Sequence, residues 1–329
     1  TDPSLSAETA KAIEEANGGQ LSGDKICTAT VDNLGYGYIG IAADVVNVGG
    51  DIDSEASKNL RKAFATIYAV YRDVAIDSYY GERASVINYP ISNTSWAAPQ
   101  PTDADYKVAF STDVNGNEIY TSDMTAEDKY AAAKQAALGY FEAAGYTVSD
   151  GKITAAPEGA KMEYEVYIPA DGTGDHPSFM ILTLAKEAMA DIGMNLIVRD
   201  LSNSTELWDG LDARTVAMWA AAWGATVDPD MYQIYYSDIA NGGKNPGGSN
   251  YEYHIQDAEL DQLILDGRAS TDQSYRKSVY KACLDIIVDW AVEVPVYQRQ
   301  NCEIFSAERI DFCCIHYLCI NEMSSNFIY

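Results

Sequence analysis

The stretch MEYEVYIPADGTGDHPSFMILTLAKEAMADIGMNLIV, residues 162–198, decides the fold class. Its first part, residues 162–168, alternates apolar and polar side chains, and this period of two predicts a strand. Pro177 then opens a predicted helix, and Gly193 closes it. Residues 194–198 alternate again and predict a second strand.

The same order of elements continues downstream. A short helix is expected at 203–211, and the apolar run at 215–223 predicts another strand. Strand, helix, strand, helix, strand is typical of a three-layer α/β domain with right-handed crossovers. Two further helices are expected at 258–269 and 274–290, and a final strand at 294–300.

Two longer helices are predicted upstream of this module. Apolar residues recur at helical spacing over 54–81, where Ser54 is a suitable N-cap and Gly81 a suitable end. A second helix is expected from Thr125 to Ala144, with Gly145 as its stop.

Length and charge restrict the classes of protein that fit. The chain has 329 residues, enough for about two domains. Its formal net charge of −27 repels phosphate backbones and anionic lipid headgroups, so no nucleic-acid partner is expected. No apolar run reaches the roughly 18 residues of a membrane span, and the first residues lack the pattern of a signal peptide. We therefore expect either a mature form or an internal piece of a longer protein.

Motifs for catalysis or metal binding are missing from the sequence. It has no Gly-x-Ser-x-Gly, His-Glu-x-x-His or Gly-x-Gly-x-x-Gly pattern, and the glycine-rich loop at 241–250 lacks the Gly-Lys-Ser/Thr of a phosphate cradle. Cys27 and Cys283 lie in apolar segments and are expected to be buried. The cysteines of residues 313–319 do not have zinc-finger spacing. We expect no enzyme, no catalytic residue, no metal and no cofactor.

Aromatic residues are the more informative feature, with 24 tyrosines and 5 tryptophans in the chain. Such side chains line pockets for organic ligands, because they combine apolar contact with one hydrogen bond. Trp290 lies on the apolar face of a predicted helix and is assigned to the core. Trp223 ends the strand at 215–223, and ligands of α/β sheets bind beyond the carboxyl ends of strands.

Several stretches together resemble the dipeptide and oligopeptide-binding proteins of ABC importers, the family 5 extracellular solute-binding proteins, and specifically the C-terminal half of that family. The stretches are Tyr36 to Ile41, Leu60 to Phe64 with Tyr71 to Asp73, Phe141 to Tyr146, Trp223 to Asp230, Tyr275 to Lys281 and Val294 to Tyr297. Their order and approximate spacing match the family over about residues 20 to 310.

The resemblance implies a periplasmic-binding-protein-like lobe, with terminal segments that belong to a second lobe and a hinge that closes over the ligand. Residues 1–40 would be the hinge and a second-lobe segment, 41–296 the C-terminal ligand-binding lobe, and 297–329 the return to the second lobe. It further implies a monomer that works with permease subunits. Its place would be the periplasm or the extracellular face of the cytoplasmic membrane, held only through an N-terminal lipid outside this chain.

The resemblance also implies where a solute would bind. The expected ligand contacts are Tyr38, Trp96, Trp223, Gly224, Ala225, Thr226 and Asp228. A bound peptide would lie extended and pair with backbone groups, and its amine would need a carboxylate. Thr226 stands where peptide-binding members have an aspartate. Asp228 either replaces that aspartate or, followed by Pro229, caps a helix that begins there.

Three alternatives to peptide capture remain open. A binding protein of the same family for a non-peptide solute would explain Thr226. A secreted hydrolase would change its ligand chemically, whereas a binding protein would only be stabilised by it. A surface adhesion or signalling module would use the same lobe with its solute cleft empty.

Overall fold

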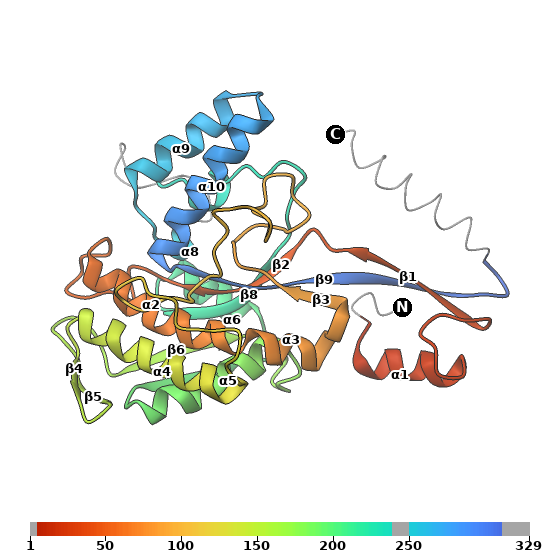
Figure 1. The fold of residues 1–329 in the computed structure, drawn as a ribbon, viewed down its shortest axis with the longest axis horizontal. Coiled ribbons are helices and arrows are strands. Elements are labelled where there is room, and N and C mark those ends of the chain that lie inside the picture. Colours follow the sequence, from red (N-terminus) through yellow and green to blue (C-terminus); the bar gives the residue numbers. More distant parts are fainter. Residues whose placement is uncertain (1–4, 239–249, 311–329) are drawn as a thin grey trace. The chain divides into compact units, whose positions relative to one another are not determined.

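The structure is a computed structural model that describes residues 5–238 and 250–310 (Figure 1). The helices are α1 (Ala7–Ala16), α2 (Glu55–Val70), α3 (Arg72–Tyr80), α4 (Ala126–Ala143), α5 (Pro177–Asp191), α6 (Thr205–Asp212), α7 (Tyr232–Tyr235), α8 (Asn250–Tyr253), α9 (Ala258–Ala269) and α10 (Gln273–Trp290). The strands are β1 (Ile26–Asp32), β2 (Tyr36–Ile41), β3 (Ala84–Val86), β4 (Thr147–Ser149), β5 (Lys152–Ala155), β6 (Glu163–Ile168), β7 (Asn195–Asp200), β8 (Met218–Trp223) and β9 (Glu293–Ser306).

The chain divides into two compact units. The smaller unit takes in the described residues of 1–33, 79–84 and 299–329, and the larger unit takes in those of 34–78 and 85–298. In the smaller unit, β1 pairs antiparallel with the second part of β9. Its small apolar core joins α1 to that strand pair through Leu5, Ile13 and Cys302.

The larger unit contains a mixed sheet with the strand order β9-β2-β8-β6-β7. Strand β6 runs parallel to both β7 and β8, while β2 runs antiparallel to β8 and to β9. Helix α5 connects the parallel pair β6 and β7, as the alternating module predicted. The expected α/β fold class is confirmed.

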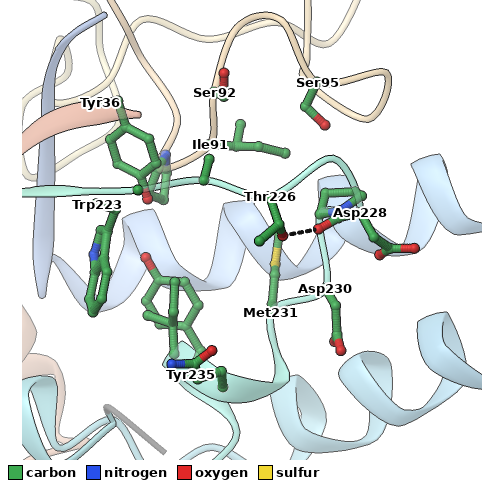
Figure 2. Close-up of a pocket in the computed structure, with 16 residues that line it drawn as sticks. Tyr36, Ile91, Ser92, Ser95, Trp223, Thr226, Asp228, Asp230, Met231 and Tyr235 are labelled. Carbon is green, nitrogen blue, oxygen red and sulfur yellow. Dashed lines mark hydrogen bonds between the residues drawn. The ribbon is translucent and has the colours of Figure 1, made fainter. Parts of the chain in front are cut away.

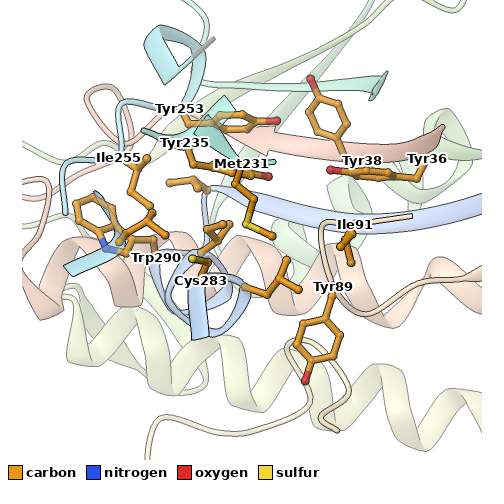
Figure 3. Packing of buried hydrophobic residues seen from close by; sticks show 14 of the residues in the cluster. Tyr36, Tyr38, Tyr89, Ile91, Met231, Tyr235, Tyr253, Ile255, Cys283 and Trp290 are labelled. Atoms are coloured by element: carbon orange, nitrogen blue, oxygen red, sulfur yellow. The ribbon is translucent and has the colours of Figure 1, made fainter. Parts of the chain in front are cut away.

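Helices cover both faces of this sheet. Successive residues of a strand point to opposite sides, so neighbouring residues of β8 contact different helices. On one side of β8, the Met218 sulfur accepts a hydrogen bond from the Tyr68 hydroxyl of α2 at 3.1 Å. The next residue, Trp219, faces the other way and packs against Tyr253 of α8, with ring centroids 5.4 Å apart. On that second side lies a large aromatic core, which includes Trp290 as expected (Figure 3).

Two glycines of β2 make room for aromatic rings from its neighbours. A Cβ on Gly40 would overlap the Trp219 ring of β8, and a Cβ on Gly37 would overlap the Tyr297 ring of β9. The central strand therefore accepts these two rings only because both positions lack a side chain.

Two buried arginines bind backbone carbonyls instead of carboxylates. Arg61 of α2 donates to the carbonyl oxygens of Trp290, Val46 and Ile52 at 2.7, 3.2 and 3.0 Å. Burial lowers the pKa of this guanidinium to about 9. The three bonds join α2 to the end of α10 and to the loop before α2, so they satisfy acceptors that the fold would otherwise bury unpaired.

Arg72 also donates to buried backbone carbonyls, and these belong to more distant parts of the chain. It donates to the carbonyl oxygens of Ile87 and Pro295 at 2.8 and 2.7 Å, and burial lowers its pKa to about 10. Its Nε also donates a hydrogen bond to the Ala69 carbonyl oxygen at 3.0 Å. The single helix predicted over 54–81 is wrong: α2 ends at Val70, the chain turns at Tyr71, and it continues as α3.

Local signals located most other elements correctly. Ser54 caps α2, Thr125 forms a capping box at α4, and Pro177 opens α5 behind His176. The His176 ring accepts a hydrogen bond from the Ser178 amide at 3.1 Å, and burial lowers its pKa to about 4, which keeps the accepting ring neutral.

The remaining expectations had mixed outcomes. Cys283 is buried as expected, whereas Cys27 is partly exposed, because its strand β1 is not enclosed. The loop at 241–249 and the cysteines of 313–319 lie outside the described residues. Within the described residues, no helix is both long and apolar enough to cross a bilayer.

Replacing Arg72 with methionine is expected to lower the free energy of unfolding by about 3 kcal/mol or more, because several buried carbonyls lose their donor at about 1–3 kcal/mol each. Urea unfolding followed by tryptophan fluorescence measures this. The control is Arg199→Met on β7, where the guanidinium pairs with Glu165 at the surface and a much smaller loss is expected. Equal losses in the two variants would contradict the role of Arg72.

Candidate ligand-binding site

A pocket of about 190 Å³ lies beyond the carboxyl end of β8 (Figure 2). Three stretches of the larger unit surround it: Tyr36 at the start of β2, the loop at 90–95, and the segment 223–235. Strand β2 is antiparallel to β8 and pairs Tyr36 with Trp223, which brings the two rings to the same edge of the sheet. The pocket is therefore positioned by the register of the sheet.

Five of the seven expected contacts line this pocket: Trp223, Gly224, Ala225, Thr226 and Asp228. Apart from Gly224 and its two chain neighbours, no heavy atom of the described chain would lie within 4 Å of a Cβ built on Gly224. Gly224 thus borders open space, and the fold itself does not require glycine there.

The other two expected contacts, Tyr38 and Trp96, are not among the lining residues. Tyr38 is fully buried behind Trp223, and the two rings stack with centroids 5.7 Å apart and planes 9° apart. Trp96 packs against Tyr280, with centroids 6.2 Å apart, and against the Arg276 guanidinium. Tyr38 therefore backs a lining residue directly, whereas Trp96 contacts Arg276, which in turn pairs with the lining residue Asp228.

The carboxylates at the pocket are already paired with arginines. Arg276 donates to both oxygens of Asp228 at 2.8 and 3.0 Å, and this hydrogen bonding raises the pKa of the guanidinium. Asp230 likewise meets Arg268 at 3.2 Å. The charges at this end of the pocket are therefore largely balanced.

The prediction that Asp228 caps a helix is wrong. Helix α7 begins only at Tyr232, and the Tyr232 amide donates to Asp230 at 3.0 Å. The Asp228 backbone carbonyl accepts instead from the Thr226 hydroxyl at 2.7 Å, which closes a tight turn (Figure 2). The Asp228 carboxylate pairs with Arg276 on α10 and does not cap a helix.

Sequence reasoning missed several pocket residues. Ser92 and Ser95 come from a loop without any recognised pattern, and Tyr235 comes from the short helix α7. Behind Tyr235 and Trp223 lies Glu293, a fully buried carboxylate at the start of β9. A charged residue between Val292 and Val294 in a buried strand was the signal that could have identified it.

The pocket suits an organic ligand better than a metal ion. Its walls combine rings and aliphatic side chains with hydroxyls and one amide. Among the described residues, no group of three or more His, Cys, Asp or Glu side chains is arranged to hold a metal ion. The arrangement can therefore enclose an apolar group and hydrogen-bond a polar one.

Solved structures share this fold at low sequence identity. The oligopeptide-binding protein AppA of Bacillus subtilis, in complex with a nonapeptide, superposes with a TM-score of 0.64 at 20% identity, over 91% of this chain and 50% of that one. NikA of Brucella suis, in complex with Fe(III)-EDTA, gives 0.59 at 16%, over 93% and 52%. DppA of Helicobacter pylori, in complex with the peptide STSA, gives 0.54 at 14%, over 84% and 44%.

The present chain thus spans about half the length of these structures. No curated protein sequence matches it significantly. The sequence profile of the bacterial extracellular solute-binding proteins, family 5 (middle region), matches residues 5–245, which is more than half of the chain. The resemblance found in the sequence is confirmed: this chain belongs to the family 5 bacterial extracellular solute-binding proteins.

Proposed function

We propose that this chain carries the ligand-contacting part of the substrate-binding component of an ABC importer. It captures a small solute outside the cytoplasmic membrane and delivers it to the permease subunits. Residues 41–296 form the binding lobe, and the terminal segments contribute to a second lobe. The observation that carries this proposal is the aromatic pocket beyond β8, which lies on the expected segment Trp223 to Asp228.

Peptides are the leading substrate class. AppA of Bacillus subtilis and DppA of Helicobacter pylori are both described with bound peptides. A peptide bound in extended form leaves room for one side chain in the pocket between Trp223 and Tyr235. Backbone pairing would provide affinity, and the pocket would select among side chains.

A non-peptide solute is the second candidate, favoured by the pairing of Asp228 with Arg276. A free amine gains little from a carboxylate that an arginine already neutralises. Thr226 adds a hydroxyl where an aspartate was expected. The site therefore suits a group that is uncharged or carries its charge elsewhere.

A leucine in place of Gly224 is expected to block the pocket while leaving the fold intact, because the new side chain enters open space. The full-length protein, purified without denaturation, is examined by native mass spectrometry for co-purified solute. The variant should retain the melting temperature but lose at least about tenfold in solute occupancy or affinity. Gly139→Ala on α4 is the control and should keep the solute. Undiminished solute in the Gly224 variant would place the binding site elsewhere.

Amine recognition is tested with peptides of the same sequence whose amino terminus is free or acetylated. Because Arg276 already pairs with the Asp228 carboxylate, we expect little contact between that carboxylate and a peptide amine. Acetylation of the peptide and the Asp228→Asn substitution should each change the dissociation constant of the peptide less than about threefold. Isothermal titration calorimetry measures both.

The converse variant, Arg276→Gln, frees the Asp228 carboxylate and should create a preference for the free amine. A wild-type preference of more than about tenfold that Asp228→Asn abolishes would show that Asp228 binds the amine despite its arginine.

A further inference from the structure

The strongest unassigned feature is the buried carboxylate of Glu293, where β9 begins. One of its oxygens, Oε2, accepts hydrogen bonds from the hydroxyl of Tyr235 at 3.0 Å and from the hydroxyl of Tyr253. The indole Nε1 of Trp223 donates to Tyr253 Oη at 2.8 Å and also approaches Oε2 at 3.4 Å. A single oxygen thus gathers donors from α7, α8 and β8.

No cation balances this charge within the part of the chain that the structure describes. The groups that face Glu293 are the hydroxyls of Tyr36 and Tyr38 on β2, Tyr235 on α7 and Tyr253 on α8. Glu252, the other carboxylate nearby, lies close to Tyr38 and supplies no cation either. Burial raises the pKa of Glu293 to about 7, and the hydrogen bonds from Tyr253, Tyr235 and Trp223 oppose this rise.

The second oxygen of Glu293, Oε1, is buried and has no hydrogen-bond partner among the described residues. A proton on Oε1 would therefore find no acceptor, and a proton on Oε2 would compete with the three donors. Ionised acceptors also form hydrogen bonds about twice as strong as neutral ones. The arrangement around Oε2 is built for the ionised carboxylate.

Two of the donors are walls of the pocket. Trp223 and Tyr235 both line it (Figure 2), and Trp223 is further held by its stack on Tyr38. We propose that Glu293 is a positioning residue for this pocket: its ionised carboxylate holds Trp223 and Tyr235 in place as walls, and protonation loosens both. Its importance for solute capture rests on the proposed function.

Stability does not explain why this residue is a glutamate. The pKa of Glu293 is raised in the folded state, so its contribution to stability is complete below the unfolded value of about 4.5 and is lost as pH rises through about 7. Above that pH, the buried carboxylate no longer adds to stability through its raised pKa. A carboxylate kept at a stability disadvantage is typical of a functional site.

The test follows the indole signals of the full chain by NMR, with ¹⁵N-labelled tryptophan and no solute present. The Trp223 signal is assigned by its loss in Trp223→Phe. In the wild-type protein we expect it to move with pH, with a midpoint near 7, between about pH 5.5 and about pH 8.5. The exposed Trp208 on α6 should stay fixed.

In Glu293→Gln the Trp223 signal should no longer move with pH, while the matched control Glu303→Gln, at an exposed position of β9, should leave the wild-type titration unchanged. A Trp223 signal that does not move in the wild-type protein, or that moves alike in Glu293→Gln, overturns the proposal. The result is independent of the solute, so it stays separate from any failure of the proposed function.

Two conservative variants keep the proposal falsifiable if Glu293→Gln folds poorly. Tyr253→Phe and Tyr235→Phe each remove one donor to Oε2, and so each should raise the midpoint. The hydrogen bond from Tyr253 opposes the raised pKa more than that from Tyr235, so its loss should give the larger rise. A midpoint that is unchanged in both variants would reduce Glu293 to a packing role and overturn the proposal.

Discussion

The guanidinium of Arg72 is the constraint on which the larger unit most depends. It binds the backbone carbonyls of Ala69 in α2, of Ile87 in the loop after β3, and of Pro295 in β9, which lies more than two hundred residues away. The loop that follows Ile87 carries one wall of the pocket, and the strand that contains Pro295 begins with Glu293. One buried side chain therefore fixes two parts of the candidate site relative to the helix layer, without any carboxylate partner.

The elements that were predicted from sequence are those whose causes are local. Thr125 and Pro177 start their helices through contacts within one turn, and Gly193 ends a helix through its own backbone angle of φ 90°. The break at Tyr71 was not predictable in this way, because no glycine or proline marks it in residues 68–75. Strand β1 was missed because its partner, the end of β9, lies more than two hundred residues later in the chain.

The candidate site shows the same division. Its central segment was recognised because Trp223 and the residues after it follow a strand, where ligands of α/β sheets bind. The state of its charges was not recognised, because the partner of Asp228 is Arg276 on a distant helix. Glu293 was visible as a charge in an apolar strand, but its donors come from three other elements. The sequence therefore predicted which edge of the sheet carries the candidate site, but not the ion pairs and hydrogen bonds of its carboxylates.

The glycines at this edge differ in how freely they can be exchanged during evolution. The rings of Tyr297 and Trp219 fill the space that a side chain at Gly37 or Gly40 would need. A substitution at either glycine of β2 therefore requires a compensating change in a neighbouring strand. Gly224 has no such neighbour. A side chain at position 224 can therefore change the volume of the pocket while the strands of the sheet stay unchanged.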